Sequence, residues 1–221
     1  MSKAVLISIR SEWCEKIANH QKTIEVRKTR PKIQTPFKVY IYCTKSAPIM
    51  GRYVSERIKS FHEYAVTGDR HNIFRGGDSL YQANGRVIGE FVCDRIIPWE
   101  DDMTPPVPLA DMGMTYPEVR KYGGLTETLY LWHISDLVIY DKPKSLYDFI
   151  KPGRKSIDSL DEDLCKYCSD FDYGEKAYYG TPDGPVMCEG ASCDKAYQAY
   201  LDDEGFTLYR PPQSWCYVEE I

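Results

Sequence analysis

The polar segment HQKTIEVRKTRP, residues 20 to 31, holds the side chains best suited to chemistry. Its alternation predicts a strand with Glu25 and Arg27 on one face and Lys22 at its start. Side chains two residues apart on one strand face are about 7 Å apart, so they can converge on one small ligand. Arg27 can hold a phosphate or a base edge, and Lys22 can add a point charge. Glu25 can accept a hydrogen bond from an exocyclic amine such as that of cytosine. The alternative is an exposed Glu and Arg pair worth less than about 1 kcal/mol.

Four cysteines near the end of the chain form a second pattern, C-x2-C-x19-C-x4-C, made of Cys165, Cys168, Cys188 and Cys193. This spacing is close to that of tetrahedral four-cysteine zinc sites. Because no His lies between residues 151 and 210, the pattern favours a structural zinc ion over an open catalytic one. Free buried thiols are the alternative, since disulfides are not expected in a reducing compartment.

Short elements are predicted to position these groups. A helix follows the first strand and runs from Ser11, its expected N-cap, to about His20. Gly89 is the expected bulge or bend of a long strand. The predicted strands cover residues 4–9, 23–28, 37–44, 85–100 and 129–134, with 137–140 as a continuation or a strand of its own, and a last strand in QSWCYVEEI. Six or so strands with irregular connections indicate a small mixed barrel and not a doubly wound sheet.

The expected domain organisation is one barrel with two additions. Residues 1–150 form the barrel, and helical spacing of Val54, Ile58, Phe61 and Ala65 predicts a helical insertion over about 45–84. Residues 151–210 form the cysteine-rich insertion, and residues 211–221 return as the final barrel strand. The chain has no GxGxxG or GxxxxGK[ST] motif, so dinucleotide and nucleoside-triphosphate sites lose their main support.

Charge and hydropathy limit the possible partners. The net charge of -5 argues against indiscriminate coating of nucleic acid, which requires many phosphate contacts. Residues 1 to 60 nevertheless hold 13 Lys and Arg against 4 Asp and Glu, which fits a local site for an anionic ligand or simply a solvated surface. No apolar segment is long enough for a membrane span, and no signal peptide is evident at the N-terminus. We therefore expect no membrane partner and a cytoplasmic location.

Five segments in chain order resemble the ASCH family, whose members are common in bacteria and phages. KTIEVR, after a strand and a helix, resembles the signature GxKxxExR, and it is followed by PFKVYIYCT, GRVIGEFVCDRI, LYLWHISDLVIYDKP and RPPQSWCYVEE. The resemblance implies an α+β, PUA-like mixed β-barrel with flanking helices that binds RNA or modified nucleosides beside the motif. His20 departs from the family pattern, which has Gly there, and we expect Asn19 to make the tight turn instead.

The resemblance also implies a set of ligand-binding residues. Tyr130 and Trp132 share a strand face and are candidates for stacking or for a pocket wall, with core packing as the alternative. Glu90 is either a pocket carboxylate or a solvated residue at a bend. The full set of candidates is Ser8, Arg10, Lys22, Glu25, Arg27, Glu90, Tyr130 and Trp132.

The first functional hypothesis is a binding protein for RNA, a nucleoside or a nucleotide. Some small ASCH-like proteins are amidohydrolases that deacylate acetylcytidine with a KxxT motif, in which Thr is the nucleophile and Lys activates it. Glu25 stands at that Thr position here, and a carboxylate is a poor substitute for a hydroxyl nucleophile, although it can act as a general base. A hydrolase of modified nucleosides or RNA, with Lys22 and Glu25 as catalytic candidates, is therefore the second hypothesis. A phage-type protein interaction module is the third.

Overall fold

The computed structural model describes residues 2–63, 79–100, 104–126, 128–154, 178–181, 184–187 and 194–221. The chain divides into two compact units, one of residues 1–146 with 210–221 and the other of residues 147–209. No helix in the described ranges combines the length and apolar character that a membrane span requires.

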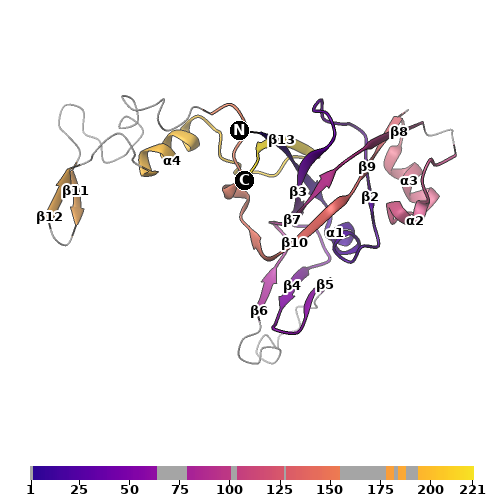
Figure 1. Ribbon diagram of the computed structural model, residues 1–221, viewed down its shortest axis with the longest axis horizontal. Coiled ribbons are helices and arrows are strands. Elements are labelled where there is room, and N and C mark those ends of the chain that lie inside the picture. The colour runs from indigo at the N-terminus through magenta and orange to yellow at the C-terminus, as the bar shows by residue number, and fades with distance from the viewer. Residues whose placement is uncertain are drawn as a thin grey trace. The chain divides into compact units, whose positions relative to one another are not determined.

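The first unit contains a five-stranded sheet in the order β10-β7-β3-β1-β13. Its strands are β1 (Lys3–Ile9), β3 (Phe37–Cys43), β7 (Arg86–Cys93), β10 (Ser135–Lys144) and β13 (Trp215–Glu219). β1 pairs in parallel with β3 and antiparallel with β13, which brings the two ends of the chain to neighbouring strands (Figure 1). On one face of this sheet, alternate residues such as Val5, Val39 and Phe91 pack with helix α1 (Ser11–Ala18) in the main core.

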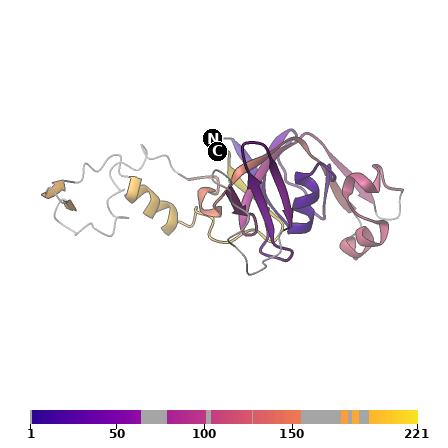
Figure 2. The ribbon, with the colours of Figure 1, turned by 90° about the horizontal axis from the view of Figure 1, so that it is seen from below.

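A second sheet has the order β2-β9-β8, formed by β2 (Ile24–Arg27), β9 (Thr128–His133) and β8 (Ile96–Glu100). One face carries Ile24, Val26 and Leu131, which pack with α2 (Leu109–Met112) and α3 (Tyr116–Gly123) in a smaller core. The two helices lie beside this sheet in Figures 1 and 2. The opposite face contributes Trp132 to the main core, so this small sheet is covered on both sides. All four residues of β2 are consequently buried.

These sheets confirm the predicted α+β class, although strand pairing among the described residues does not close them into one barrel. The predicted strand over 85–100 is interrupted at Asp94 and Arg95, where the chain leaves β7 in the large sheet and enters β8 in the small one. Residues 137–140 belong to β10, a strand separate from β9, and Asp136 between them has a left-handed φ of 47°. Each break transfers the chain between sheets.

Gly89 lies at a bulge, as predicted. The register of β3 and β7 shifts between Ile41 and Tyr42, next to the pairing of Ile41 with Gly89. A Cβ atom at Gly89 would lie 2.3 Å from the carbonyl oxygen of Val138 on β10. Only glycine therefore allows β7 and β10 to approach this closely.

The predicted helical insertion over 45–84 is wrong within the described residues. They form a three-stranded antiparallel sheet of β4 (Met50–Val54), β5 (Lys59–Glu63) and β6 (Ser79–Gln82), which projects from the first unit in Figure 1. Val54 ends β4 and Phe61 lies in β5, so their helical spacing spans two paired strands. Short apolar runs do not distinguish the two periods, and cross-strand pairing decided the outcome. Ala65 lies outside the described residues.

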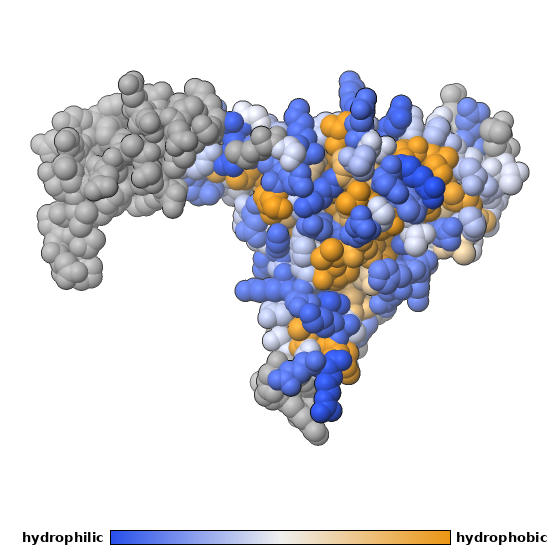
Figure 3. Space-filling view, in the orientation of Figure 1, coloured by the Kyte–Doolittle hydropathy of each residue, from blue (hydrophilic) through white to orange (hydrophobic). Residues whose placement is uncertain are grey.

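Smaller elements complete the chain. A 3-10 helix, η1 (Leu146–Asp148), lies where the chain passes from the first unit into the second. The second unit contains β11 (Tyr178–Thr181), β12 (Gly184–Met187) and α4 (Asp194–Asp203), and within it Tyr200 of α4 packs against Tyr197 and Phe206. The face in Figure 3 is largely hydrophilic, with several separate apolar patches over the first unit. Val138 of β10 is one of the exposed large apolar residues, at 51%.

Candidate ligand-binding site

The turn that leads into the charged segment is made by His20. Its φ is 56°, in the left-handed region, and its backbone N–H donates to the carbonyl of Ile17. Asn19, the C-cap of α1, has a φ of -96° and donates its backbone N–H to the carbonyl of Glu15. The prediction that Asn19 makes the turn is therefore wrong. Left-handed geometry is needed at the position where the ASCH pattern has Gly, and His is among the residues that enter this region more often than most.

The cap at the other end of α1 also differs from the prediction. Arg10 is the N-cap, with extended backbone angles, and Ser11 is the first helical residue. The Ser11 hydroxyl donates to the carbonyl of Ser46 at 3.2 Å and makes no capping bond. Ser11 is fully buried, so this long-range bond satisfies a polar group that has left water.

Glu25 is held between two cations. One of its oxygens lies 3.3 Å from Lys22 Nζ and the other lies 3.0 Å from Arg27 Nη2. All three side chains are less than 10% exposed. The three side chains lie close together and pair with one another, and their convergence on a ligand stays a prediction. The exposed strand pair is excluded, because the face that carries these residues is buried against the main core.

Lys22 is fixed by the backbone as well as by Glu25. Its Nζ donates to the carbonyl oxygens of Ile24 at 2.8 Å and Met112 at 2.6 Å. Burial lowers the pKa of Lys22, and the negative charge of Glu25 opposes that shift. The Met112 bond ties Lys22 to the end of α2, where a positive charge is favoured. Lys22 is thus committed to protein partners, which suits a positioning role better than direct contact with a ligand.

Arg27 connects the same cluster to β1 of the large sheet. Its Nη2 donates to the carbonyl of Ser8 at 2.7 Å, and its Nη1 lies 3.4 Å from Ser214 Oγ. The Ser8 hydroxyl donates elsewhere, to the carbonyl of Pro212 at 2.7 Å. Ser8 is therefore a neighbour of the cluster as predicted, but through its backbone.

Two predicted aromatic residues lie directly opposite the charged pair. In the antiparallel pairing of β2 with β9, Glu25 is opposite Trp132 and Arg27 is opposite Tyr130. Trp132 is fully buried against Phe37 and Trp215, at ring distances of 5.9 and 6.3 Å. Tyr130 is half-buried, and the Arg30 guanidinium lies 5.7 Å from its ring centroid. Trp132 is thus a core residue with a polar edge, while Tyr130 is nearer the surface.

Three buried polar atoms on this face make no hydrogen bond to any described part of the protein. They are Glu25 Oε2, Arg27 Nε and Trp132 Nε1. Glu25 Oε2 has the Lys22 ion pair but no hydrogen bond of good geometry. A buried polar group without a hydrogen bond costs about 1 to 3 kcal/mol. The buried face of the β2–β9 pair therefore holds one acceptor and two donors whose hydrogen-bonding capacity is not used by the described protein.

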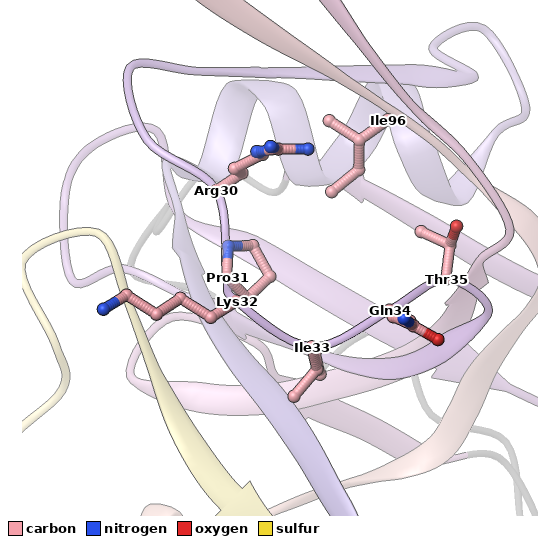
Figure 4. A pocket seen from close by; sticks show the side chains of 7 residues that line it. All are labelled: Arg30, Pro31, Lys32, Ile33, Gln34, Thr35 and Ile96. Carbon is pink, nitrogen blue, oxygen red and sulfur yellow. The ribbon is translucent and has the colours of Figure 1, made fainter.

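A pocket of about 640 Å³ opens beside this cluster, and sequence reasoning missed it. It lies between the loop that joins β2 to β3 and Ile96 at the start of β8 (Figure 4). Ile96 is opposite Trp132 in the β8–β9 pairing, just as Glu25 is opposite Trp132 on the other side. The basic run RKTRPK at residues 27–32 was the available signal for this loop. Its lining residues are Arg30, Pro31, Lys32, Ile33, Gln34, Thr35 and Ile96.

The structure does not bring the remaining predicted ligand contacts into the cluster. Arg10 is exposed at the start of α1. Glu90 lies on the large sheet, where it accepts from the Tyr140 hydroxyl and pairs with Lys38 at 3.3 Å. It stands on the strand face opposite the Phe91 side that packs in the main core. Of the two predicted roles of Glu90, the structure therefore favours the residue near the surface, because Glu90 pairs with Lys38 and Tyr140 on the large sheet. Alternation within one strand does not show which sheet that strand joins.

The predicted zinc ligands, Cys165, Cys168, Cys188 and Cys193, lie outside the described residues. Among the residues that are described, no group of three or more His, Cys, Asp and Glu side chains could hold a metal ion. Cys14, Cys43 and Cys93 are free thiols buried in the first unit, and Cys216 is half-buried.

The comparisons with known proteins identify similar solved structures but no related sequence. No protein-family model and no curated protein matches the chain. Among the solved structures, ASCH from Zymomonas mobilis is 14% identical, with a TM-score of 0.40, over 90% of this chain and 94% of its own. A point mutant of the Zymomonas mobilis protein gives the same identity and TM-score over 91% and 98% of the two chains. A second point mutant gives 14% and 0.39 over 90% and 94%.

The chain is similar in fold to these ASCH structures. A TM-score of about 0.4 at 14% identity carries no argument about ligand or activity, so the functional conclusion must come from this chain's own site.

Proposed function

We propose that the first unit binds a nucleoside or nucleotide, free or within RNA, and holds its base with Glu25, Arg27 and Trp132. The observation that carries the proposal is the set of three buried polar atoms without hydrogen bonds, one acceptor and two donors. A ligand that satisfies them must offer one donor and two acceptors. The ASCH resemblance of the KTIEVR segment supports the same conclusion.

The complementary edge is that of a pyrimidine. Cytosine offers an amino donor with two acceptors, N3 and O2, and uracil offers an N3–H donor with two carbonyl acceptors. The Watson–Crick edge of guanine offers two donors and one acceptor. One of its donors would then face a donor of the protein, Arg27 Nε or Trp132 Nε1. Single-stranded RNA and free nucleotides expose these edges, whereas base pairs in a duplex occupy them. We therefore place pyrimidines ahead of purines.

The charges around Glu25 favour recognition of a neutral base. Glu25 is paired with Lys22 and Arg27, each within ion-pair distance, so its carboxylate needs no cation from the ligand. Lys22 orients Glu25 through bonds to two carbonyls, and Arg27 is oriented by Ser8. Fixed side chains lose little entropy when a ligand binds, which raises affinity for a matched edge.

The test is equilibrium binding of cytidine, uridine, adenosine and guanosine to the wild-type chain and to two variants. We expect pyrimidines to bind more tightly than purines. Glu25→Gln should weaken pyrimidine binding by about tenfold to hundredfold, because a charge-assisted contact is lost. Trp132→Phe keeps a ring but removes one donor, and it should weaken binding by about three- to tenfold.

Glu90→Gln is the matched control, since Glu90 is also a candidate from the sequence but lies on the other sheet. It should change affinity by less than about twofold. Equal effects of the Glu25 and Glu90 variants, or no effect of either Glu25→Gln or Trp132→Phe in folded protein, would refute the site. Incubation with acetylcytidine should give little hydrolysis; turnover that Glu25→Gln abolishes would favour the hydrolase hypothesis instead.

A further inference from the structure

The loop between β2 and β3, residues 28–36, is positively charged where it lines the pocket. Arg30 and Lys32 are in the lining, and no acidic side chain is. Between Val26 and Ser55 the chain has no Asp or Glu at all. In Figure 4 the loop curves around the pocket from Arg30 to Thr35, with Ile96 facing it and Lys32 directed away from the centre. Arg30 is therefore the cation best placed to act within the pocket.

The pocket and the base-binding cluster share one face of the small sheet. Ile96, Trp132 and Glu25 form a row across β8, β9 and β2. Pro98, Tyr130 and Arg27 form the next row. Because directly opposed residues of antiparallel strands point to the same side, Ile96 of the pocket and Glu25 of the cluster are separated by one side chain, Trp132.

Arg30 provides the second link between the pocket and the cluster. Its guanidinium lies 5.7 Å from the ring centroid of Tyr130, the residue opposite Arg27. Tyr130 therefore has two neighbouring cations: Arg27, opposite it on β2, and Arg30, over its ring. A ligand group that contacts Arg30 in the pocket therefore lies near Tyr130, which is the strand neighbour of Arg27.

The loop is anchored on both sides of Arg30. Trp215 Nε1 donates to Thr29 Oγ1 at 2.9 Å, and the backbone N–H of Lys32 donates to the Tyr217 hydroxyl at 2.7 Å. Ile33 packs against the main core. These contacts fix the backbone of residues 29–33 before a ligand arrives, so little ordering is required on binding.

We propose that this pocket binds the phosphate group of a nucleoside monophosphate whose base lies at Glu25, with Arg30 as the phosphate ligand. The inference rests on the proposed base-binding function and specifies its ligand as an anionic nucleotide in preference to a neutral nucleoside. A planar guanidinium matches two phosphate oxygens at once. The pocket volume of about 640 Å³ is within the roughly 300 to 1,000 Å³ typical of small-molecule sites.

The experiment compares cytidine with cytidine 5′-monophosphate by titration calorimetry on the wild-type chain, on Arg30→Gln and on Lys28→Gln. Lys28 is the matched control, because it is an exposed cation of the same loop but does not line the pocket. The wild type should bind the monophosphate at least about tenfold more tightly than cytidine. Arg30→Gln should reduce this preference to less than about twofold without changing the cytidine affinity, and Lys28→Gln should retain it.

The failures are distinguishable from one another. Binding of neither compound would overturn the proposed function and this inference together. Cytidine binding that depends on Glu25 but shows no preference for the monophosphate would overturn the inference alone. A preference that Arg30→Gln and Lys28→Gln reduce equally would also overturn it, because it would reflect the general charge of the loop. High salt should weaken monophosphate binding more than cytidine binding, and equal weakening would count against a phosphate contact.

Discussion

Substitution of Glu25 by Gln tests whether the buried cluster has the electrostatic character described above. Gln has nearly the same shape, so the change removes charge and leaves no cavity. Lys22 and Arg27, 2% and 8% exposed in their side chains, would then be buried without their shared counter-charge. Loss of one partner from a buried ion pair costs about 3 to 5 kcal/mol. We expect a loss at the lower end of that range, because carbonyl oxygens continue to hold both cations.

The destabilisation should also depend on pH. Burial already lowers the pKa of Lys22, and Glu25 opposes that shift, so its loss should lower this pKa further. Between the folded and the unfolded pKa of Lys22, the unfolded chain binds more protons than the folded chain. Stability from this group therefore rises with pH, and the penalty of Glu25→Gln should be smaller at about pH 9.5 than at about pH 7.

The assay is urea unfolding of the wild type and the variant at both pH values. Asp141→Asn is the control, because Asp141 also pairs with one Lys and one Arg, Lys59 at 2.6 Å and Arg52 at 3.4 Å, but is 47% exposed. That variant should lose far less stability than Glu25→Gln, since water screens the pair. The reasoning is refuted if the two variants are equally destabilised, or if the penalty of Glu25→Gln grows toward the higher pH.

Three further outcomes are expected. Gly89→Ala should destabilise the chain by about 1 to 3 kcal/mol in urea unfolding, because its Cβ would meet the Val138 carbonyl. Gly123→Ala in helix α3 is the control and should be neutral or stabilising. Equal losses of stability in the two variants would contradict the close approach at Gly89. Burial raises the pKa of Cys93 to about 12, so above about pH 9 the unfolded chain loses the thiol proton before the folded chain does. Stability in urea unfolding should therefore fall with pH more steeply in the wild type than in Cys93→Ala. Parallel pH profiles of the two proteins would contradict the raised pKa. We also propose that the four clustered cysteines bind zinc: elemental analysis should find about one zinc per chain, released by Cys165→Ser, whereas less than about a tenth of an equivalent would exclude the site.

Local pattern was sufficient for most strands and for the charged segment. Alternation of Phe37, Val39 and Ile41 placed β3 correctly, since one face of that strand packs in the main core. The proximity of Lys22, Glu25 and Arg27 also follows from spacing alone, because neighbours on a short strand remain neighbours in any fold. Gly89 was identified as a bulge for a similar reason: its lack of a side chain is a property of the residue itself.

The environment of those residues was decided by the tertiary structure. Alternation on β2 placed Glu25 and Arg27 on one face but left open whether that face is exposed to solvent. In the structure, α2 and α3 cover one side of the small sheet and the main core covers the other. The helix predicted from the spacing of Val54, Ile58 and Phe61 was also decided by tertiary structure. Pairing between β4 and β5 overrode that short local pattern.

The long-range register determined which residues share the site. Pairing of β9 with both β2 and β8 places Ile96, Trp132 and Glu25 in one row, although they come from three separate parts of the sequence. It also left Glu90 on the other sheet. Residue type and spacing therefore defined the charges available to this protein. Only the packing of two sheets decided that these charges are buried, that Trp132 lies beside them, and that a basic loop opens a pocket next to both, because side-chain direction on a strand acquires meaning only when its partners are known.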